Sequence, residues 1–220
     1  MNLNHKQATA FRKSIYRQIL HCSVLAGAVA AVFVGPVAAQ TGAWQINTPE
    51  SAVTFTARHM MVTTIGGFSK FSGTVQYDPK DVSKTVIQAT IDTASENSGV
   101  EGRDRDVHSE HFLDVAKYPT ITFQSKRAEA VGEGKLKVTG DLTIRGVTKE
   151  VVLDVEGPTP LVKDKRGGLH MGAEATTRIN RKDFGIIYNP LLDNGGAIVS
   201  DEVRINLQIE LTQAAASAAN

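Results

Sequence analysis

Apolar and polar residues alternate with a period of two over the longest regular stretch of the chain, residues 136–156. The apolar positions form two runs, Leu136, Val138, Leu142 and Ile144, then Val151, Leu153 and Val155. Because successive side chains of a strand point to opposite faces, this period predicts strands with one buried and one solvated face. Gly146 lies between the runs, where a tight turn requires positive φ. The stretch therefore predicts a long β-hairpin with arms of roughly ten residues.

The same alternation predicts further strands on both sides of this hairpin, over residues 44–47, 53–59, 71–77, 85–92, 120–126, 170–180 and 203–211. We expect Gly66-Gly67 to break the chain and the charged segment 97–114 to hold a short helix. No spacing typical of βαβ units occurs. About eight strands joined by turns favour an all-β fold, an eight-stranded antiparallel barrel, because closure removes exposed edges. A two-sheet sandwich is the alternative.

The first 39 residues differ from the rest of the chain. Four basic residues precede an apolar run over 19–34, and Val37-Ala38-Ala39 then supplies small side chains. This order is typical of a secretory signal peptide, cleaved here before Gln40, with an uncleaved membrane anchor as the alternative. We therefore expect a signal peptide at 1–39, one barrel domain at 40–212 and a frayed tail at 213–220.

Composition narrows the function. Cys22, the only cysteine, lies in the predicted signal peptide, so the mature chain would have neither disulfides nor thiol chemistry. Without the four basic residues of that segment, 20 basic residues face 23 acidic ones, a net charge of about −3. This balance argues against a nucleic acid or an anionic membrane held by general electrostatics.

The candidate chemistry is sparse. A cluster of acidic and histidine side chains could suggest zinc, with His108 and His111 on one helix face: Asp104, Asp106, His108, His111 and Asp114. A charged, solvated helix explains the same cluster, and we expect no metal and no cofactor. The chain has no GxSxG motif and no phosphate-binding glycine loop. We therefore expect a binding protein and not an enzyme.

The inside of the predicted barrel is either packed or hollow. Several inward positions hold small residues, among them Ala57, Ala89 and Ala173, which leave volume unfilled. We therefore expect a hollow interior, lined by Phe55, Phe71, Phe123, Leu142, Ile144 and Phe184. A filled barrel acting as an interaction module and an enzyme acting on a small amphiphile in the cavity are the alternatives.

The ten residues Gly140–Lys149, GDLTIRGVTK, resemble the signature of the YceI-like proteins. Other matching stretches keep the family order: residues 44–46, 67–73, 112–123, 181–185 and 201–203. The resemblance covers nearly all of the predicted mature chain. It implies a lipocalin-like, eight-stranded barrel in the periplasm that binds a polyisoprenoid, a quinone-like lipid or a similar amphiphile in an apolar tunnel, for carriage or sequestration.

One departure from that family concerns the head group of the ligand. Where the family commonly reads R-D-x-H-L-x-S, this chain reads Arg103-Asp104-Arg105-Asp106-Val107-His108-Ser109, so Asp106 replaces a histidine. If that position contacts the head group, an anionic side chain disfavours a phosphate and favours a neutral quinone or alcohol. Our head-group candidates are Arg58, His59, Arg103, Asp106 and His108, with Arg181 and Asp183 further out.

Apolar residues also lie in the loop 186–196, among them Ile187, Tyr188, Leu191 and Leu192. Apolar loop residues of this kind need a cover. We expect the loop to close the tunnel or to form a homodimer contact, and a transient membrane contact is compatible with a lipid carrier.

Overall fold

The computed structural model describes residues 43–190 and 198–213, and the predicted signal peptide, Cys22 and tail residues 214–220 lie outside them. The strands are β1 (Trp44–Ile46), β2 (Ala52–His59), β3 (Val62–Phe68), β4 (Phe71–Gln76), β5 (Val86–Asp92), β6 (Glu96–Asn97), β7 (Thr120–Gly132), β8 (Lys135–Ile144), β9 (Val147–Glu156), β10 (Val162–Lys163), β11 (Leu169–Asn180) and β12 (Val199–Gln213). Helix α2 covers Glu101–His108, and four 3-10 turns are η1 (Thr48–Glu50), η2 (Val82–Lys84), η3 (Thr93–Ser95) and η4 (Arg181–Phe184). None of the helices in these two ranges has both the length and the apolar character needed to cross a bilayer.

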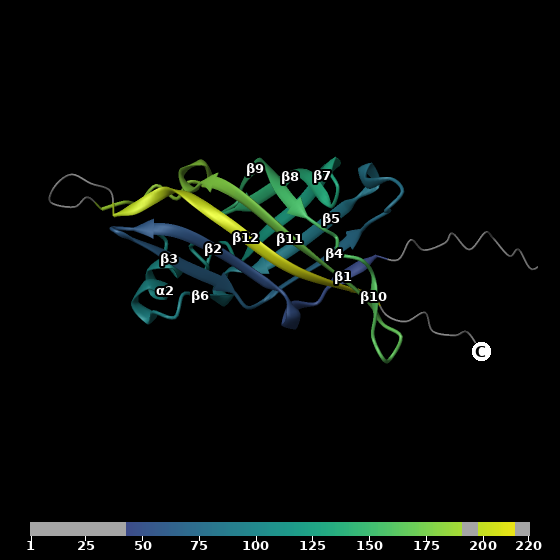
Figure 1. Cartoon of the computed structure of the whole chain (residues 1–220). Helices are drawn as coiled ribbons and strands as arrows, with labels where there is room; N and C mark the ends of the chain where they lie inside the picture. The colour runs from purple at the N-terminus through teal and green to yellow at the C-terminus, as the bar shows by residue number, and fades with distance from the viewer. Residues whose placement is uncertain (1–42, 191–197, 214–220) are drawn as a thin grey trace, which may run out of the picture. The chain divides into compact units, whose positions relative to one another are not determined.

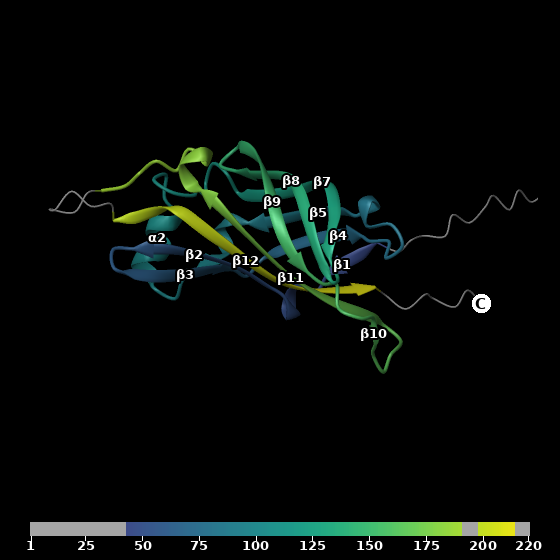
Figure 2. The same ribbon diagram turned by 45° about the horizontal axis from the view of Figure 1, so that its top comes forward.

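The strands form one antiparallel sheet that closes on itself (Figures 1 and 2). Eight strands form the ring, in the order β11-β9-β8-β7-β5-β4-β1-β12, and β12 then pairs with β11. The closing contact is long, since all of β11 from Leu169 to Asn180 pairs with β12. The predicted eight-stranded barrel is therefore confirmed, and the sandwich is wrong.

Three strands of the ring, β1, β4 and β5, are each followed or preceded along the chain by a second strand after a short break. Turn η1 separates β1 from β2, residues Ser69-Lys70 separate β3 from β4, and η3 separates β5 from β6. Ser95 of η3 joins two of these breaks, because its carbonyl accepts from Ser69 N and its hydroxyl accepts from Lys70 N, at 3.2 and 3.1 Å. These contacts satisfy backbone donors where the strand ladder stops.

The central hairpin agrees with its prediction. Strands β8 and β9 have ten residues each and pair without a register shift, from the pair Lys135–Glu156 to the pair Ile144–Val147. Arg145 and Gly146 both have positive φ, 50° and 72°, as a two-residue type I′ turn requires. The alternating apolar residues of β8 face the barrel interior, and Leu136, Val138, Leu142 and Ile144 are all buried.

Two local predictions are wrong. Gly66 and Gly67 do not break the chain, because both lie within β3, which the β-branched residues of 62–65 extend up to them. His111 does not share a helix face with His108, because α2 ends at His108 and the next residues form turns. Strand β7 also continues six residues beyond the predicted end at Lys126.

Gly140 permits the sharp bend between β7 and β8. It pairs with Ser125, next to a register shift between Ser125 and Arg127. A Cβ atom on Gly140 would lie 2.5 Å from the Gln124 carbonyl oxygen and 2.6 Å from the Phe123 ring. A bulge combined with a glycine is a usual way for a strand to turn a barrel corner.

We therefore predict that Gly140→Ala lowers the free energy of unfolding by about 1–3 kcal/mol, because the backbone or the Phe123 ring must move. Gly132→Ala is the matched control, since its Cβ would have no neighbour closer than 3.9 Å. Urea unfolding of both variants measures the difference. Equal stability of the two variants would contradict the assigned role of Gly140.

Candidate functional site: an apolar cavity with a polar end

The barrel encloses a cavity of about 700 Å³. Val199 faces it at the start of β12, and after a register shift so do the alternate residues from Val203 to Leu211. Twelve residue steps of a strand span about 40 Å, so the hollow is long relative to its volume. Its lining is almost entirely aliphatic and aromatic, which suits an extended apolar chain.

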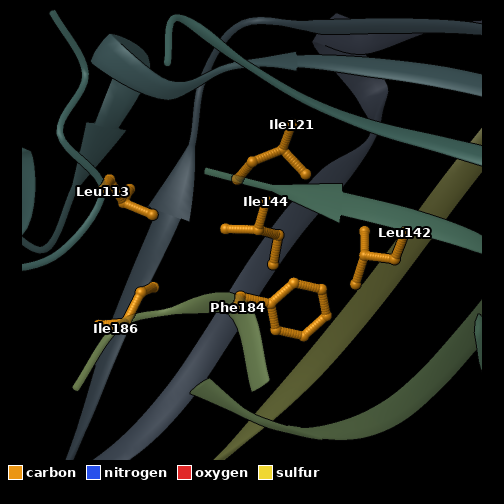
Figure 3. Packing of buried hydrophobic residues seen from close by; sticks show 6 residues of the cluster. All are labelled: Leu113, Ile121, Leu142, Ile144, Phe184 and Ile186. Atoms are coloured by element: carbon orange, nitrogen blue, oxygen red, sulfur yellow. The ribbon is translucent and has the colours of Figure 1, made fainter. Parts of the chain in front are cut away.

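The six side chains expected to line a tunnel all lie on this cavity: Phe55, Phe71, Phe123, Leu142, Ile144 and Phe184. Their burial differs. Leu142, Ile144 and Phe184 pack into a tight cluster with Leu113, Ile121 and Ile186, and Phe184 is only 2% exposed (Figure 3). The other three are only half-buried although they point inward. Inward aromatic rings with free surface are the mark of an unfilled interior.

The predicted head-group residues separate into two sets. His59, Arg103 and Asp106 line the cavity. Arg58 does not, because β2 alternates and its side chain is exposed on the outer face, opposite Ala57 and His59. His108 also lies off the cavity, with its Nε2 3.1 Å from the Glu96 carbonyl oxygen. Neither Arg58 nor His108 therefore faces the cavity, and His108 contacts Glu96 instead.

Glu96 is the polar cavity residue that the sequence did not reveal. It is the first residue of β6, pairs with Phe68 of β3, and its side chain is fully buried against the cavity. Neither carboxyl oxygen has a hydrogen-bond partner. A two-residue strand carries no alternation, so no pattern indicated that this glutamate points inward.

Gly66 makes room for the Glu96 carboxyl group. A Cβ atom on Gly66 would lie 2.8 Å from Glu96 Oε1 and would also collide with the Phe55 ring. The carboxyl group therefore lies close to a glycine backbone and an aromatic ring, and neither of its oxygens accepts a hydrogen bond there.

The pKa of Glu96 is raised to about 7, chiefly by burial and in smaller part by the neighbouring Asp104, while Arg103 opposes the shift. His108 Nε2 lies 3.4 Å from Glu96 Oε2, close enough for an ion pair. That nitrogen also lies 3.1 Å from the Glu96 main-chain carbonyl oxygen, so it is shared between the two groups. Burial therefore has the largest effect on the pKa of the carboxyl group. Glu96 is therefore largely uncharged below neutral pH.

Arg181 lines the cavity but has a structural role. Its side chain is 3% exposed, and it donates hydrogen bonds to the carbonyl oxygens of Ile186, Tyr188 and Ser200, at 2.6, 2.8 and 3.0 Å. These bonds tie the segment after η4 to the start of β12. Asp183 is exposed and lies off the cavity. Neither residue is placed to bind a head group.

The acidic and histidine cluster of residues 104–114 does not converge. Asp104 accepts from Ser98 N at 2.8 Å, and His111 stacks on Tyr188 with ring centroids 4.1 Å apart. Across residues 43–190 and 198–213, no three His, Cys, Asp or Glu side chains come together in a way that could hold a metal ion.

Comparison with known proteins assigns this barrel to a family. The YceI-like domain family matches residues 44–211. The chain therefore belongs to the YceI-like family. A UPF0312 protein of Vibrio cholerae serotype O1 is 36% identical over 167 residues, which cover 74% of this chain and 88% of the relative. The matched range contains every strand that lines the cavity and nearly all of β12.

Solved structures agree with this YceI-like assignment. BcnA of Burkholderia cenocepacia superposes with a TM-score of 0.65 at 29% identity, covering 75% of this chain and 98% of its own. A domain from Saccharophagus degradans, described as a polyisoprenoid-binding domain implicated in plant cell wall breakdown, gives a TM-score of 0.55. It is 16% identical and covers 78% of this chain and 98% of its own, so it shows the shared fold alone.

The buried Glu96 of this YceI-like barrel makes stability depend on pH. Below pH 4.5 the carboxyl is protonated in both the folded and the unfolded chain. Between about pH 4.5 and 7 the unfolded chain ionises first, so the folded protein loses stability, and above pH 7 the loss is constant. We predict that Glu96→Gln, which does not titrate, gains up to about 3 kcal/mol relative to the wild type between pH 4.5 and 8.

Urea unfolding of both proteins at the two pH values measures this double difference. The exposed Glu110→Gln is the control, for which we expect no change with pH. A Glu96→Gln effect equal at pH 4.5 and 8 would show that the carboxyl is hydrated and not buried.

Proposed function

We propose that this protein binds a long-chain apolar lipid, a polyisoprenoid or an isoprenoid quinone-like amphiphile, inside the barrel. The observation that carries the proposal is the long apolar cavity, which residues of β12 line from Val199 to Leu211. The description of the Saccharophagus degradans domain as polyisoprenoid-binding supports the same ligand class. Binding, and not catalysis, is the activity that this lining favours.

Burial alone can hold such a ligand. Each methylene group removed from water contributes about 0.8 kcal/mol, so ten buried groups would contribute roughly 8 kcal/mol before the cost of ordering the chain. The half-buried side chains of Phe55, Phe123 and Leu207 would also lose their remaining contact with water. No covalent bond or metal ion is needed for tight binding.

Carriage or sequestration of this lipid in the periplasm completes the proposal. The basic, apolar and small-residue order of residues 1–39 supports export. A protein that shields a long apolar chain from water is useful in an aqueous compartment between two membranes. Mass spectrometry of lipids extracted from the purified protein tests ligand class, and N-terminal mass spectrometry tests cleavage before Gln40.

A tunnel-blocking variant tests the site. Leu207 lies mid-strand on β12 with its side chain on the cavity, and its neighbour Gln208 is exposed on the outer face. We predict that Leu207→Trp weakens binding of a fluorescent polyprenyl probe by about tenfold or more, because the indole occupies the path of the chain. Gln208→Trp, with the same indole on the opposite face, should bind like the wild type.

Equal affinities for these two variants, with circular dichroism unchanged in both, would mean that the lipid does not pass β12. Probe binding absent even from the wild type would count against the lipid-binding proposal itself.

One end of the barrel is suited to lipid entry. The β2–β3 turn and the first residues of β3 expose apolar side chains, with Met61 at 93% and Ile65 at 61%, and Ile187 of the neighbouring segment is 71% exposed. Met60 N donates to the Ile198 carbonyl oxygen at 2.6 Å, so the turn lies beside the start of β12. Met60, Ile65 and Tyr188 also line the cavity. We propose that this end contacts the membrane surface during loading.

We predict that replacing Met61 and Val62 together with serine slows lipid transfer from vesicles to the protein by about tenfold, because the apolar contact with the bilayer is lost. The affinity for the lipid in detergent solution should not change. Leu161→Ser with Val162→Ser is the control, since these residues are 56% and 60% exposed beside the far end of β12. Slower transfer in the control and not in the first variant would place the entrance at the opposite end.

A further inference from the structure

Glu96 raises a question that the apolar cavity does not answer. The cavity lining is mostly hydrocarbon, and a fully buried carboxyl group there costs stability. Buried polar groups normally have hydrogen-bond partners. Neither oxygen of Glu96 has one, and the nearby His108 Nε2, 3.4 Å from Oε2, makes no hydrogen bond to the carboxyl group. A partner that enters with the ligand accounts for the exception.

Resting on the proposed lipid binding, we propose that Glu96 binds the head group of the lipid and selects an uncharged head that carries a hydroxyl or a carbonyl oxygen. Isoprenoid alcohols, quinols and quinones belong to this class. A phosphorylated isoprenoid does not. Glu96 is therefore a specificity-determining residue of the cavity.

The position of Glu96 fits a head-group site. It lines the same cavity as His59, Ser98, Arg103 and Asp106, all of which lie on or next to β2, β6 and α2. These polar residues gather beside the β3 strand that bears Gly66, while the rest of the lining accommodates a chain. A lipid with its tail along β12 would thus place its head group against Glu96.

The chemistry of the carboxyl group decides between the possible heads. An uncharged carboxyl can donate its hydrogen to a carbonyl or hydroxyl oxygen, and its own carbonyl oxygen can accept from a hydroxyl. Both requirements are met by an alcohol or quinol and one of them by a quinone. Burial keeps Glu96 uncharged up to about pH 7, so the neutral form is available for this contact.

The charges around Glu96 disfavour a phosphate head. Asp104 and Asp106 lie on α2, and Arg103 is the cation of that helix that lines the cavity. A diphosphate would bring two or more negative charges next to these carboxylates and to Glu96. One half-buried arginine and the histidines His59 and His108 do not offset that repulsion.

A cationic head group is expected to bind less well at this site than a neutral one. It would require Glu96 to ionise in a site where neither oxygen receives a hydrogen bond. The cation would also come close to Arg103, which lines the cavity, and to His108, whose Nε2 lies 3.4 Å from Glu96 Oε2. The fully buried position of the carboxyl makes this ionisation costly when the tail also excludes water.

The test uses four probes with the same C20 tail: geranylgeraniol, geranylgeranyl diphosphate, geranylgeranylamine and the head-free hydrocarbon. Affinities are measured at pH 6 for the full chain and for its Glu96→Gln and Glu96→Val variants. The hydrocarbon reports whether each variant keeps a folded, hollow barrel, and circular dichroism supports that reading.

We expect the wild type to prefer the alcohol to the diphosphate by about tenfold, the worth of roughly 1.4 kcal/mol. Glu96→Gln should keep the preference for the alcohol over the hydrocarbon, because its amide both donates and accepts. Glu96→Val should lose that preference, with about fivefold weaker binding of the alcohol, the effect of one net hydrogen bond. Its affinity for the hydrocarbon should be unchanged or higher.

Three results would overturn the inference. The alcohol could bind Glu96→Val as tightly as the wild type, the diphosphate could be the preferred probe, or the amine could be preferred in a manner that depends on Glu96. All of them leave the lipid-binding proposal standing. Failure of the wild type to bind any probe, the hydrocarbon included, would instead remove the proposed function together with the inference.

Discussion

Closure of the sheet by β12 is the constraint on which the rest of the structure depends. This strand pairs with β11 along one side, and with β1 and β2 along the other. Both edges of β12 are thereby paired, and the ring of eight strands is closed. Without this closure the inward apolar residues would face water, because no second sheet covers them.

A closed barrel with a hollow interior has an energetic consequence. Core residues such as Val138 and Phe184 are fully buried, whereas Phe55 and Phe123 keep exposed surface inside the cavity. The protein therefore forgoes part of the burial that a packed interior would supply. Long strand ladders and the three tight clusters around Phe184, Trp44 and Val138 hold the wall in place, and a bound lipid would recover the missing burial.

Much of the fold could be predicted because long amphipathic strands show a clear alternation of apolar and polar residues. The alternation of Leu136–Ile144 and of Val203–Leu211 predicted both the strands and their inward residues, and Gly146 marked the turn. Short and interrupted elements could not be predicted in the same way. The pair Gly66-Gly67 predicts a break where strand β3 in fact continues. Arg58 is a head-group candidate by its charge, although the period of β2 turns it outward. Glu96 gave no signal, because its two-residue strand has no period and its burial depends on β3 and α2.

Gly66 links these two failures. A glycine pair inside a strand is unfavourable for the strand itself, since it lacks side chains to pack and gains backbone entropy on unfolding. Here the missing side chain of Gly66 is what allows the Glu96 carboxyl group to reach the cavity beside Phe55. The glycine in β3 and the carboxyl group without a hydrogen-bond partner are therefore parts of one arrangement. Strand β3 lacks a packing side chain at Gly66, and this leaves room for a polar group in the apolar cavity. A residue that is unfavourable for local structure is expected at a functional site, where the stability of the rest of the fold compensates for it.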